Sequence, residues 1–135
     1  VSEKTASKYF NPKVNDILIT AAGEGTIGRA CIVTEDKKWI TTGEVMILRP
    51  NGKINPFYLL YYLRSNIGRQ QLIRFSRGSS GQTHLYSKDV CTMLVPFISP
   101  DVQNKYEEEY LSAKDLRDQM LVKLEAMLKR VNTIL

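Results

Sequence analysis

Short hydrophobic runs rich in Ile, Val and Thr, punctuated by Gly, Asp and Asn, occupy much of the first fifty residues. Runs of this length and composition are typical of β-strands. They are DILIT (16–20), TIGRACIV (26–33) and EVMILRP (44–50). TEDKK (34–38) separates the last two runs, so we expect it to form a hairpin turn after which Trp39 and Ile40 rejoin the sheet.

The pattern changes at Asn55. Asn is a favoured N-cap residue and Pro suits the first helical position, so Asn55 and Pro56 predict the start of a helix. The largely apolar FYLLYYLRS (57–65) then predicts a core helix. NPFY (55–58) also resembles the Asn-Pro-Pro-Tyr/Phe loop of adenine-N6 methyltransferases, but the second proline is absent and such a catalytic domain needs a far longer chain. Helix capping is the better explanation.

A second short helix, a helix cap and a buried strand are predicted next along the chain. IGRQQLIRF (67–75) indicates the helix, with Arg69 and Arg74 off its apolar side. We expect Ser87 to cap a further helical segment. VCTMLVPF (90–97) is typical of a buried strand that ends at its proline.

One long helical pattern follows Pro100. No Gly or Pro interrupts residues 101–135, and a continuous helix there would be about 50 Å long at ~1.5 Å per residue. Only its first turns can pack on the preceding domain, so we expect the rest to pair with another helix. The apolar residues that recur at spacings of three and four are Val102, Tyr106, Tyr110, Ala113, Leu116, Met120, Leu124, Met127, Val131 and Ile134.

These elements predict an α+β fold. A small mixed globular domain of short strands and helices fills residues 1–100, and one long C-terminal helix that pairs with another helix fills residues 101–135. No stretch approaches the roughly 18 apolar residues of a membrane span, and residues 1–10 hold no apolar signal-peptide core. Cys31 and Cys91 lack a metal-type spacing, so we expect buried free thiols in a cytoplasmic protein without a membrane partner.

The net charge of +5 belongs to the first part of the chain. Residues 1–100 carry 13 Lys and Arg against 7 Asp and Glu, whereas residues 101–135 carry 6 against 7. A field of one sign attracts polyanions, although a solvated basic surface is the alternative. Residues 45–88 form an acid-free segment whose basic residues are Arg49, Lys53, Arg64, Arg69, Arg74, Arg77 and Lys88.

GEGTIG (23–28) matches the G-x-G-x-x-G pattern of dinucleotide-binding loops. Such a loop opens a helix whose N-terminus meets the pyrophosphate, but the residues that follow here, RACIVT, have no helical stripe. The same letters have the spacing of a phosphate loop, yet Arg29 and Ala30 stand where Lys and Ser or Thr are required. Turn glycines between two strands are the better explanation.

Two further patterns could indicate catalysis. EDK (35–37) with Asp16 supplies groups of a restriction-type, Mg²⁺-dependent nuclease, but these residues lie in a predicted turn rather than on a strand. His84 lies near two serines and Asp89, yet a nucleophilic triad needs a rigid elbow and an orienting acid. We therefore expect a chain that is not an enzyme and holds no cofactor or metal.

The order of the segments resembles a target-recognition domain of a type I restriction–modification specificity (S) subunit. The matching segments are DILITAAGEGTIGRACIV, EVMILRPNGKINPFYLLYYLRS and SSGQTHLYSKDVCTMLVPFISPDVQNKYEE. Their shared features are a G-x-I-G turn at 25–28, Arg49-Pro50, Pro56 with Tyr58-Leu59, a Ser/Gly/Gln loop before Ser87 to Val90, and Pro96 followed by Gln103. The family opens its first strand with Lys-Gly-Asp, where this chain has Val-Asn-Asp at 14–16, and the N-terminal part is shortened.

The resemblance implies a non-catalytic subunit of a restriction system. In that family each recognition domain binds one half of a split site on double-stranded DNA. The long helices pair antiparallel and dock methyltransferase (M) subunits and, through them, restriction (R) subunits. S-adenosylmethionine and ATP then belong to the partner subunits. Either a fragment of a two-domain subunit or a half-sized subunit that pairs with its own copy fits this pattern.

Charge and resemblance together predict which side chains contact DNA. Cations bind phosphates, and Arg77 and Gln82 are suited to recognise guanine and adenine edges. The predicted DNA-binding residues are Lys37, Lys38, Arg69, Arg74, Arg77, Ser79, Ser80, Gln82, Thr83, His84, Tyr86 and Lys88. The predicted helix-pairing residues are Tyr106, Tyr110, Ala113, Leu116, Met120, Leu124, Met127 and Val131. The alternatives are the recognition domain of a single-chain restriction–methylation enzyme and a Mg²⁺-dependent nuclease that uses Glu35.

Overall fold

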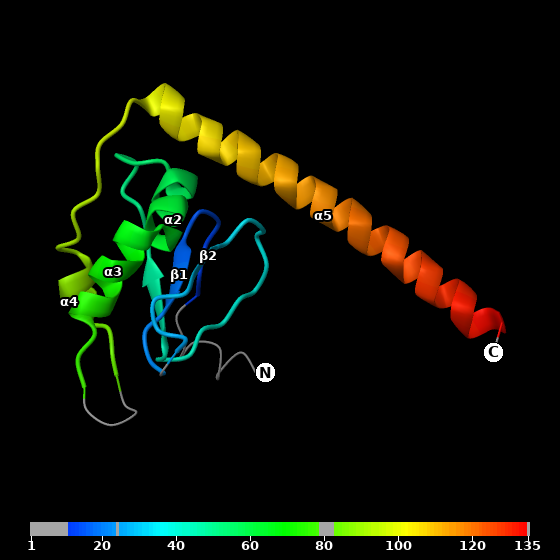
Figure 1. The fold of residues 1–135 in the computed structure, drawn as a ribbon, viewed down its shortest axis with the longest axis horizontal. Coiled ribbons are helices and arrows are strands. Elements are labelled where there is room, and N and C mark those ends of the chain that lie inside the picture. Colours follow the sequence, from blue (N-terminus) through cyan, green and yellow to red (C-terminus); the bar gives the residue numbers. More distant parts are fainter. Residues whose placement is uncertain (1–10, 24, 79–82, 135) are drawn as a thin grey trace.

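The computed structural model describes residues 11–23, 25–78 and 83–134. Within them, a three-stranded antiparallel sheet and short helices form a small α+β domain, from which one long C-terminal helix projects (Figure 1). This confirms the predicted fold class. None of the helices in the described ranges is long and apolar enough to cross a membrane.

The sheet consists of β1 (Ile17–Thr20), β2 (Ala30–Ile32) and β3 (Val45–Leu48) in the order β2-β1-β3. All three predicted runs contribute a strand, each shorter than its run. Ile17 pairs with Ile32 on one side and with Leu48 on the other, so β1 is the central strand. Ile17 and Ile19 are fully buried, and the residues that alternate with them are only half-buried, because successive side chains point to opposite faces.

The predicted hairpin at 34–38 is wrong. A tight turn there would place β3 beside β2, whereas β3 pairs with the other edge of β1 and the chain must cross the sheet. Residues 33–44 therefore form a long loop, in which the Trp39 N–H donates to the Lys37 carbonyl and the indole Nε1 donates to the Glu35 carbonyl. Trp39 and Ile40 belong to no strand, and Trp39 is 45% exposed.

Helix α2 (Pro56–Arg64) starts as the sequence predicts. The Asn55 side-chain oxygen accepts hydrogen bonds from the Phe57 N–H at 2.8 Å and the Tyr58 N–H at 3.4 Å, and Pro56 occupies the first turn. This cap explains Asn55 without a methyltransferase loop. The core face of α2 packs on the sheet, and its buried residues are Phe57, Tyr58, Leu59, Leu60 and Leu63.

Helix α3 (Asn66–Phe75) follows α2 after the single residue Ser65. A Cβ atom at Gly68 would lie 2.0 Å from the carbonyl oxygen of Tyr62, so only glycine allows the two helices to approach this closely. Leu72 is fully buried, and Arg69 and Arg74 are exposed, as the helical pattern predicts.

Two predictions after residue 86 are wrong. Ser87 does not cap a helix, because α4 (Ser87–Val90) begins at Ser87 and its N-cap is Tyr86. Residues 90–97 form no strand, and Leu94 and Phe97 are 79% and 78% exposed. The backbone carbonyls of this segment accept hydrogen bonds from tyrosine hydroxyls of α2 rather than from a neighbouring strand. Tyr62 donates to the Leu94 carbonyl and Tyr58 to the Pro96 carbonyl, each at 2.7 Å.

The prediction of buried cysteines is also wrong. Cys31 and Cys91 are free but exposed. Cys31 lies on β2 directly before the buried Ile32, so strand alternation turns it away from the core. Cys91 follows the last residue of α4, the buried Val90, on the outside of the domain.

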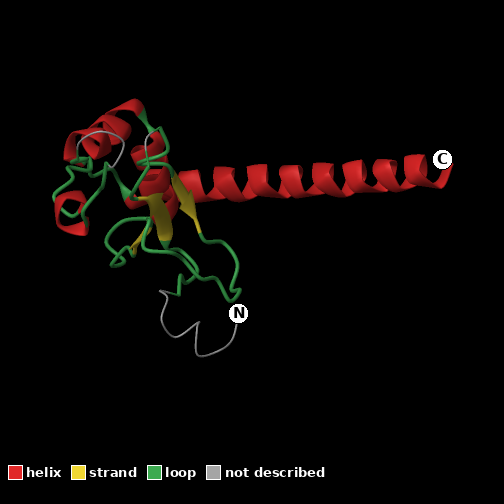
Figure 2. Ribbon diagram, turned by 90° about the horizontal axis from the view of Figure 1, so that it is seen from below, coloured by secondary structure: helices red, strands yellow, loops and turns green. Residues whose placement is uncertain are grey.

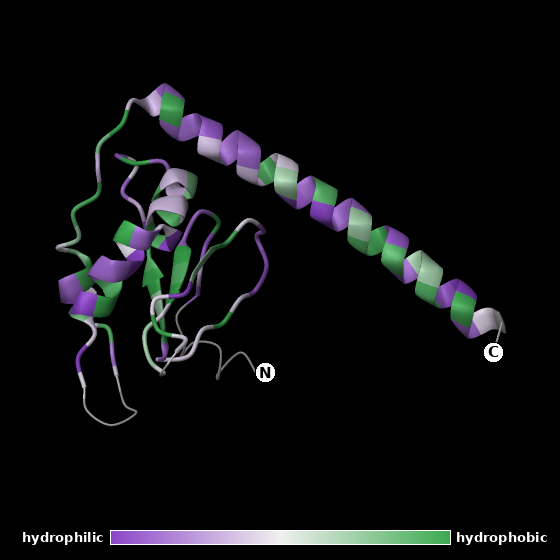
Figure 3. Cartoon of the chain, in the orientation of Figure 1, coloured by the Kyte–Doolittle hydropathy of each residue, from purple (hydrophilic) through white to green (hydrophobic). Residues whose placement is uncertain are grey.

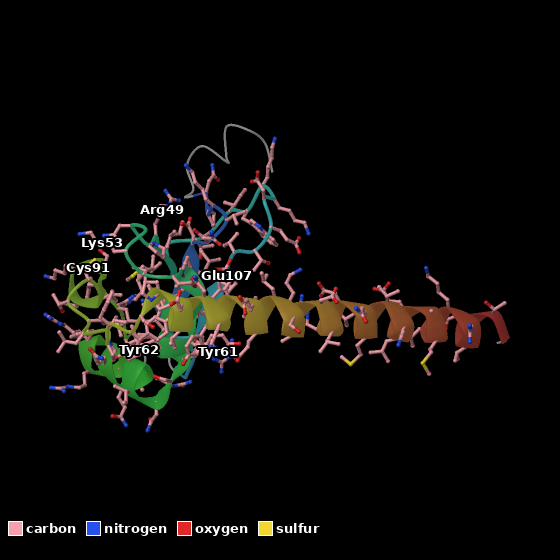
Figure 4. All side chains as sticks on the ribbon, turned by 90° about the horizontal axis from the view of Figure 1, so that it is seen from above. Arg49, Lys53, Tyr61, Tyr62, Cys91 and Glu107 are labelled. Carbon is pink, nitrogen blue, oxygen red and sulfur yellow. The ribbon has the colours of Figure 1, made fainter. Side chains whose placement is uncertain are left out.

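Helix α5 (Pro100–Ile134) starts against α2. The buried Gln103 side chain accepts a hydrogen bond from the Asn55 N–H and donates one to the Ile98 carbonyl, each at 2.8 Å. The Asn55 amide in turn donates to Glu107 at 2.8 Å, near the start of α5 in Figure 4. These bonds tie the first turns of α5 to the cap of α2.

Aromatic rings extend this contact along the next turn. The Tyr110 ring lies 5.2 Å from that of Phe57, and the Tyr106 ring lies 5.4 Å from those of Tyr58 and Tyr61. Tyr106 and Tyr110, which the sequence assigns to pairing with another helix, thus pack on their own domain. Ring pairs of this kind stabilise beyond the area they bury, by about 1 kcal/mol each.

Beyond these tyrosines α5 leaves the domain, as two perpendicular views show (Figures 1 and 2). Hydrophobic residues continue along its projecting part (Figure 3). The described apolar residues there are each between 45% and 67% exposed: Leu111, Leu116, Met120, Leu121, Val122, Leu124, Met127, Leu128 and Val131. The helix is confirmed, and its own domain leaves exposed the predicted stripe residues Leu116, Met120, Leu124, Met127 and Val131, together with Leu111, Leu121, Val122 and Leu128, which lie outside that stripe.

We predict that Gln103→Ala lowers the free energy of unfolding by about 2 kcal/mol, because the change leaves the half-buried Asn55 N–H and Ile98 carbonyl without the partners that the buried Gln103 supplies. Urea unfolding followed by circular dichroism measures the change. Gln119→Ala on the projecting part of α5 is the matched control, and it should cost less than about 0.5 kcal/mol. Equal effects of the two substitutions would contradict the docking role of Gln103.

Candidate nucleic-acid interface

The segment around His84 is attached to the sheet at one end. Arg77 and His84 exchange both backbone hydrogen bonds at 2.9 Å, and the Leu85 N–H donates to the Ala21 carbonyl at 2.8 Å. The Leu85 side chain is buried in the core. The flanks of this loop are therefore held by the end of β1. Among the predicted DNA-binding residues, Ser79, Ser80 and Gln82 lie outside the described residues.

Several predicted residues meet at one surface hollow. This recognition hollow has a volume of about 340 Å³ and is lined by Arg77, Gly78, His84, Tyr86 and Lys88. Gly78, directly after Arg77, has a φ of 146°, a backbone conformation that favours glycine. Tyr86 is 49% exposed, so an aromatic ring and two cations are accessible together. Thr83 is half-buried beside His84.

The cations near the hollow differ in their partners. The Arg77 guanidinium donates to the Asp89 carboxylate at 3.0 Å. Arg69, Arg74 and Lys88 are exposed and form no ion pair with any residue that the structure describes. Helices α3 and α4 contact each other, so these cations lie on adjoining elements beside the projecting loop (Figure 1). Their charges remain available to an anionic ligand.

Lys37 and Lys38 lie elsewhere. Their loop passes beside α5, where Glu35 forms an ion pair with Lys114 at 3.5 Å. In Figure 1 this loop lies on the β2 side of the domain, across the sheet from the loop that follows α3. Lys37 also pairs with Glu35. The predicted hairpin turn that would carry Lys37 and Lys38 is therefore not present, and the two lysines do not join the recognition hollow.

Asp16 and Glu35, the carboxylates of the nuclease hypothesis, each form ion pairs with neighbouring cations. Asp16 is 1% exposed and accepts from Arg49 at 2.8 Å and 2.7 Å and from the Lys13 N–H at 2.7 Å. The Arg49 guanidinium lowers the pKa of Asp16, and Lys37 lowers the pKa of Glu35. No cluster of three or more His, Cys, Asp or Glu side chains suited to a metal occurs within the described ranges.

The glycine-rich stretch is a turn, as predicted. The Gly28 N–H donates to the Thr20 carbonyl at 2.9 Å, and the φ of Gly28 is +78°. A Cβ atom there would meet Leu72 of α3 at 3.4 Å, so the glycine brings the β1–β2 turn against α3. This turn opens no helix, because β2 follows it directly.

Sequence reasoning missed Asp89 as the partner of Arg77. Asp89 is the acidic residue that ends the acid-free segment, and that position is the signal that could have indicated it. It also missed the Asp16–Arg49 pair, whose members lie far apart in sequence. Comparison with known proteins supplies no further residue, because no protein-family model and no curated protein matches this chain.

We predict that Arg49→Met lowers the free energy of unfolding at pH 7 by about 2 kcal/mol, since it leaves the buried Asp16 carboxylate with one partner. The folded state lowers the pKa of Asp16, so this pair stabilises the protein above the ordinary value of 3.8. The stabilisation is lost as the pH falls through the lowered pKa. Denaturant unfolding at pH 7 and pH 3 measures the free energy of unfolding of wild type and Arg49→Met under each condition.

The difference between wild type and Arg49→Met should therefore shrink at the lower pH. Lys53→Met removes an exposed positive charge close to Arg49 in sequence and serves as the control. A difference that is the same at both pH values would contradict the role assigned to the Asp16 carboxylate.

Proposed function

We propose that this chain is a non-catalytic DNA-recognition module of the kind found in type I restriction–modification specificity subunits. The recognition hollow carries this proposal, because it combines Arg77, His84, Tyr86 and Lys88 at a loop beside the sheet. It lies at the end of a segment, residues 45–88, that contains no acidic residue. Cations, a phenol and an imidazole together suit a nucleic acid better than a small apolar ligand.

The described flanks of the loop, up to Gly78 and from Thr83, support contact with duplex DNA. Arg77 and His84 pair as residues of two antiparallel strands do, and both flanks extend past α4 (Figure 1). The major groove of B-DNA, about 12 Å wide, admits a ribbon of two such strands. In this arrangement Arg77 contacts a base edge, and the exposed Arg69, Arg74 and Lys88 contact phosphates. The phosphate contacts supply affinity, whereas the base contacts supply specificity.

Helix α5 provides the proposed protein contacts. Residues 100–118 carry six acidic and three basic side chains, whereas residues 119–134 carry one acidic and three basic. An antiparallel pair of such helices places the acidic half of each opposite the basic half of the other. The exposed apolar side chains between them would be buried. The second helix belongs either to a second recognition domain of a longer subunit or to another copy of this chain.

The remaining partners follow from the resemblance. M subunits that hold S-adenosylmethionine would dock on the paired helices, and R subunits that use ATP would join through them. The chain itself would bind DNA and orient these partners without making or breaking a bond. The ion pairs of Asp16 with Arg49 and of Glu35 with Lys37 disfavour the nuclease alternative, because its metal would need these carboxylates as ligands. The surface described above serves a single-chain restriction–methylation enzyme equally well.

We predict that the triple substitution Arg69→Ala, Arg74→Ala, Lys88→Ala weakens binding to a random-sequence duplex. Each lost phosphate contact should make the negative slope of log K against log salt less steep by about 0.9. Fluorescence anisotropy of a labelled duplex over a series of salt concentrations measures the affinity and the slope.

The matched control is Lys105→Ala, Lys123→Ala, Lys129→Ala on α5, which removes the same charge from the other part of the chain. It should leave the slope unchanged. Equal slopes for wild type and the α3–α4 variant would count against a DNA contact at this surface.

We predict that Leu124→Glu with Met127→Glu abolishes self-association of the chain without destabilising the domain, because both side chains are exposed on the projecting part of α5. Sedimentation velocity over a range of concentrations measures association. Asn132→Glu with Thr133→Glu adds the same charge at exposed polar positions and should retain the dimer. A wild-type chain that stays monomeric at every concentration would leave only the two-domain form of the proposal.

A further inference from the structure

The Arg77–Asp89 ion pair has an unusual division of exposure. The Arg77 side chain is 63% exposed, whereas the Asp89 side chain is only 14% exposed. Asp89 Oδ1 accepts a hydrogen bond from Arg77 Nη2 at 3.0 Å. The other oxygen is buried and has no hydrogen-bond partner among the residues that the structure describes. A largely buried carboxylate thus holds a largely exposed guanidinium.

Stability does not explain this arrangement. An ion pair with one exposed partner contributes little to the free energy of unfolding, and a buried oxygen without a partner costs free energy. Nor does charge explain it, because a carboxylate beside the recognition hollow opposes the approach of an anionic ligand. The described contacts leave one evident effect of Asp89, which is to fix the direction of the Arg77 guanidinium.

The backbone holds both residues rigidly enough for this effect. Arg77 is fixed by its two hydrogen bonds to His84, and Asp89 lies on α4 next to the buried Val90. The contact to Asp89 uses one N–H of Nη2. An arginine has five N–H donors in a fixed plane, so the second N–H of Nη2, together with that of Nη1 or Nε, remains a parallel pair of donors that can face a ligand.

We propose that Asp89 is a positioning residue that orients Arg77 for specific recognition of a base edge in duplex DNA. This inference rests on the proposed function and adds the source of sequence discrimination to it. A guanidinium held in one plane can meet guanine O6 and N7 together, which requires a defined direction. A guanidinium without Asp89 would still attract phosphates but would lose that direction.

The two possible roles of Asp89 predict changes of opposite sign. If Asp89 acts only through its charge, Asp89→Asn removes a repulsive carboxylate and strengthens binding to every duplex. If Asp89 positions Arg77, the same substitution weakens binding to a preferred sequence by about tenfold, within the discrimination that one bidentate base contact provides. Binding to other sequences should stay the same or become tighter.

The experiment uses the full chain and two duplexes. One is enriched by the wild-type chain from a pool with a randomised central segment, and the other is a scrambled duplex of the same composition. Anisotropy titrations give the affinity ratio between them for wild type, Asp89→Asn, Arg77→Ala and the double variant. Glu108→Gln on α5 has the same change of charge away from the hollow and is the control. Thermal unfolding verifies that each variant folds.

The proposal expects a smaller affinity ratio for Asp89→Asn, an unchanged ratio for Glu108→Gln, and no further effect of Asp89→Asn once Arg77 is alanine. The positioning role would be overturned if Asp89→Asn had the wild-type affinity ratio. It would also be overturned if Asp89→Asn lowered the affinity ratio equally in the wild-type and Arg77→Ala backgrounds. A wild-type chain that binds neither duplex, or enriches no sequence, would instead overturn the proposed function.

Discussion

The two hydrogen bonds of the buried Gln103 side chain determine how the long helix is attached to the domain. They join the N–H of Asn55, which caps α2, to the carbonyl of Ile98, which precedes α5. The same Asn55 side chain caps α2 and reaches Glu107 of α5, so one residue ends up serving both helices. Beyond its first turns, the one ion pair described between α5 and the domain is Lys114–Glu35. The direction of α5 therefore depends on the hydrogen bonds of Asn55 and Gln103 and on the tyrosines beside them.

Several residues that carry the sequence resemblance hold the elements of the domain together. Arg49, after β3, pairs with Asp16 before β1, Gly28 brings the β1–β2 turn against α3, and Gln103 joins α5 to the cap of α2. None of these side chains lines the recognition hollow. A pattern built on these residues therefore indicates a fold rather than a DNA sequence, because the proposed base contacts belong to a loop with its own residues.

Local signals were enough to predict the helices, whereas the errors arose from contacts between distant residues. The cap at Asn55 and the spacing of apolar residues in α5 are encoded within a few positions, and both are confirmed. The segment at 90–97 has the composition of a strand, but hydroxyls from α2 bind its carbonyls. At the candidate site, charge indicated Arg77, yet only the fold shows that Asp89 holds it. Composition cannot specify which side chain or strand a segment will meet.

In the proposed function rigid attachment of α5 matters, because the helix sets the distance between two DNA half-sites. A helix of 35 residues is about 50 Å long at ~1.5 Å per residue. A swing of about 10° at its base would move its far end by about 9 Å, which corresponds to roughly three base pairs of B-DNA at ~3.4 Å each. Such an error would bring the second recognition hollow to the wrong bases. The buried Gln103 amide and the tilted aromatic contacts of Tyr106 and Tyr110 at the base of α5 resist this swing, so a contact remote from DNA would limit which site spacing is accepted.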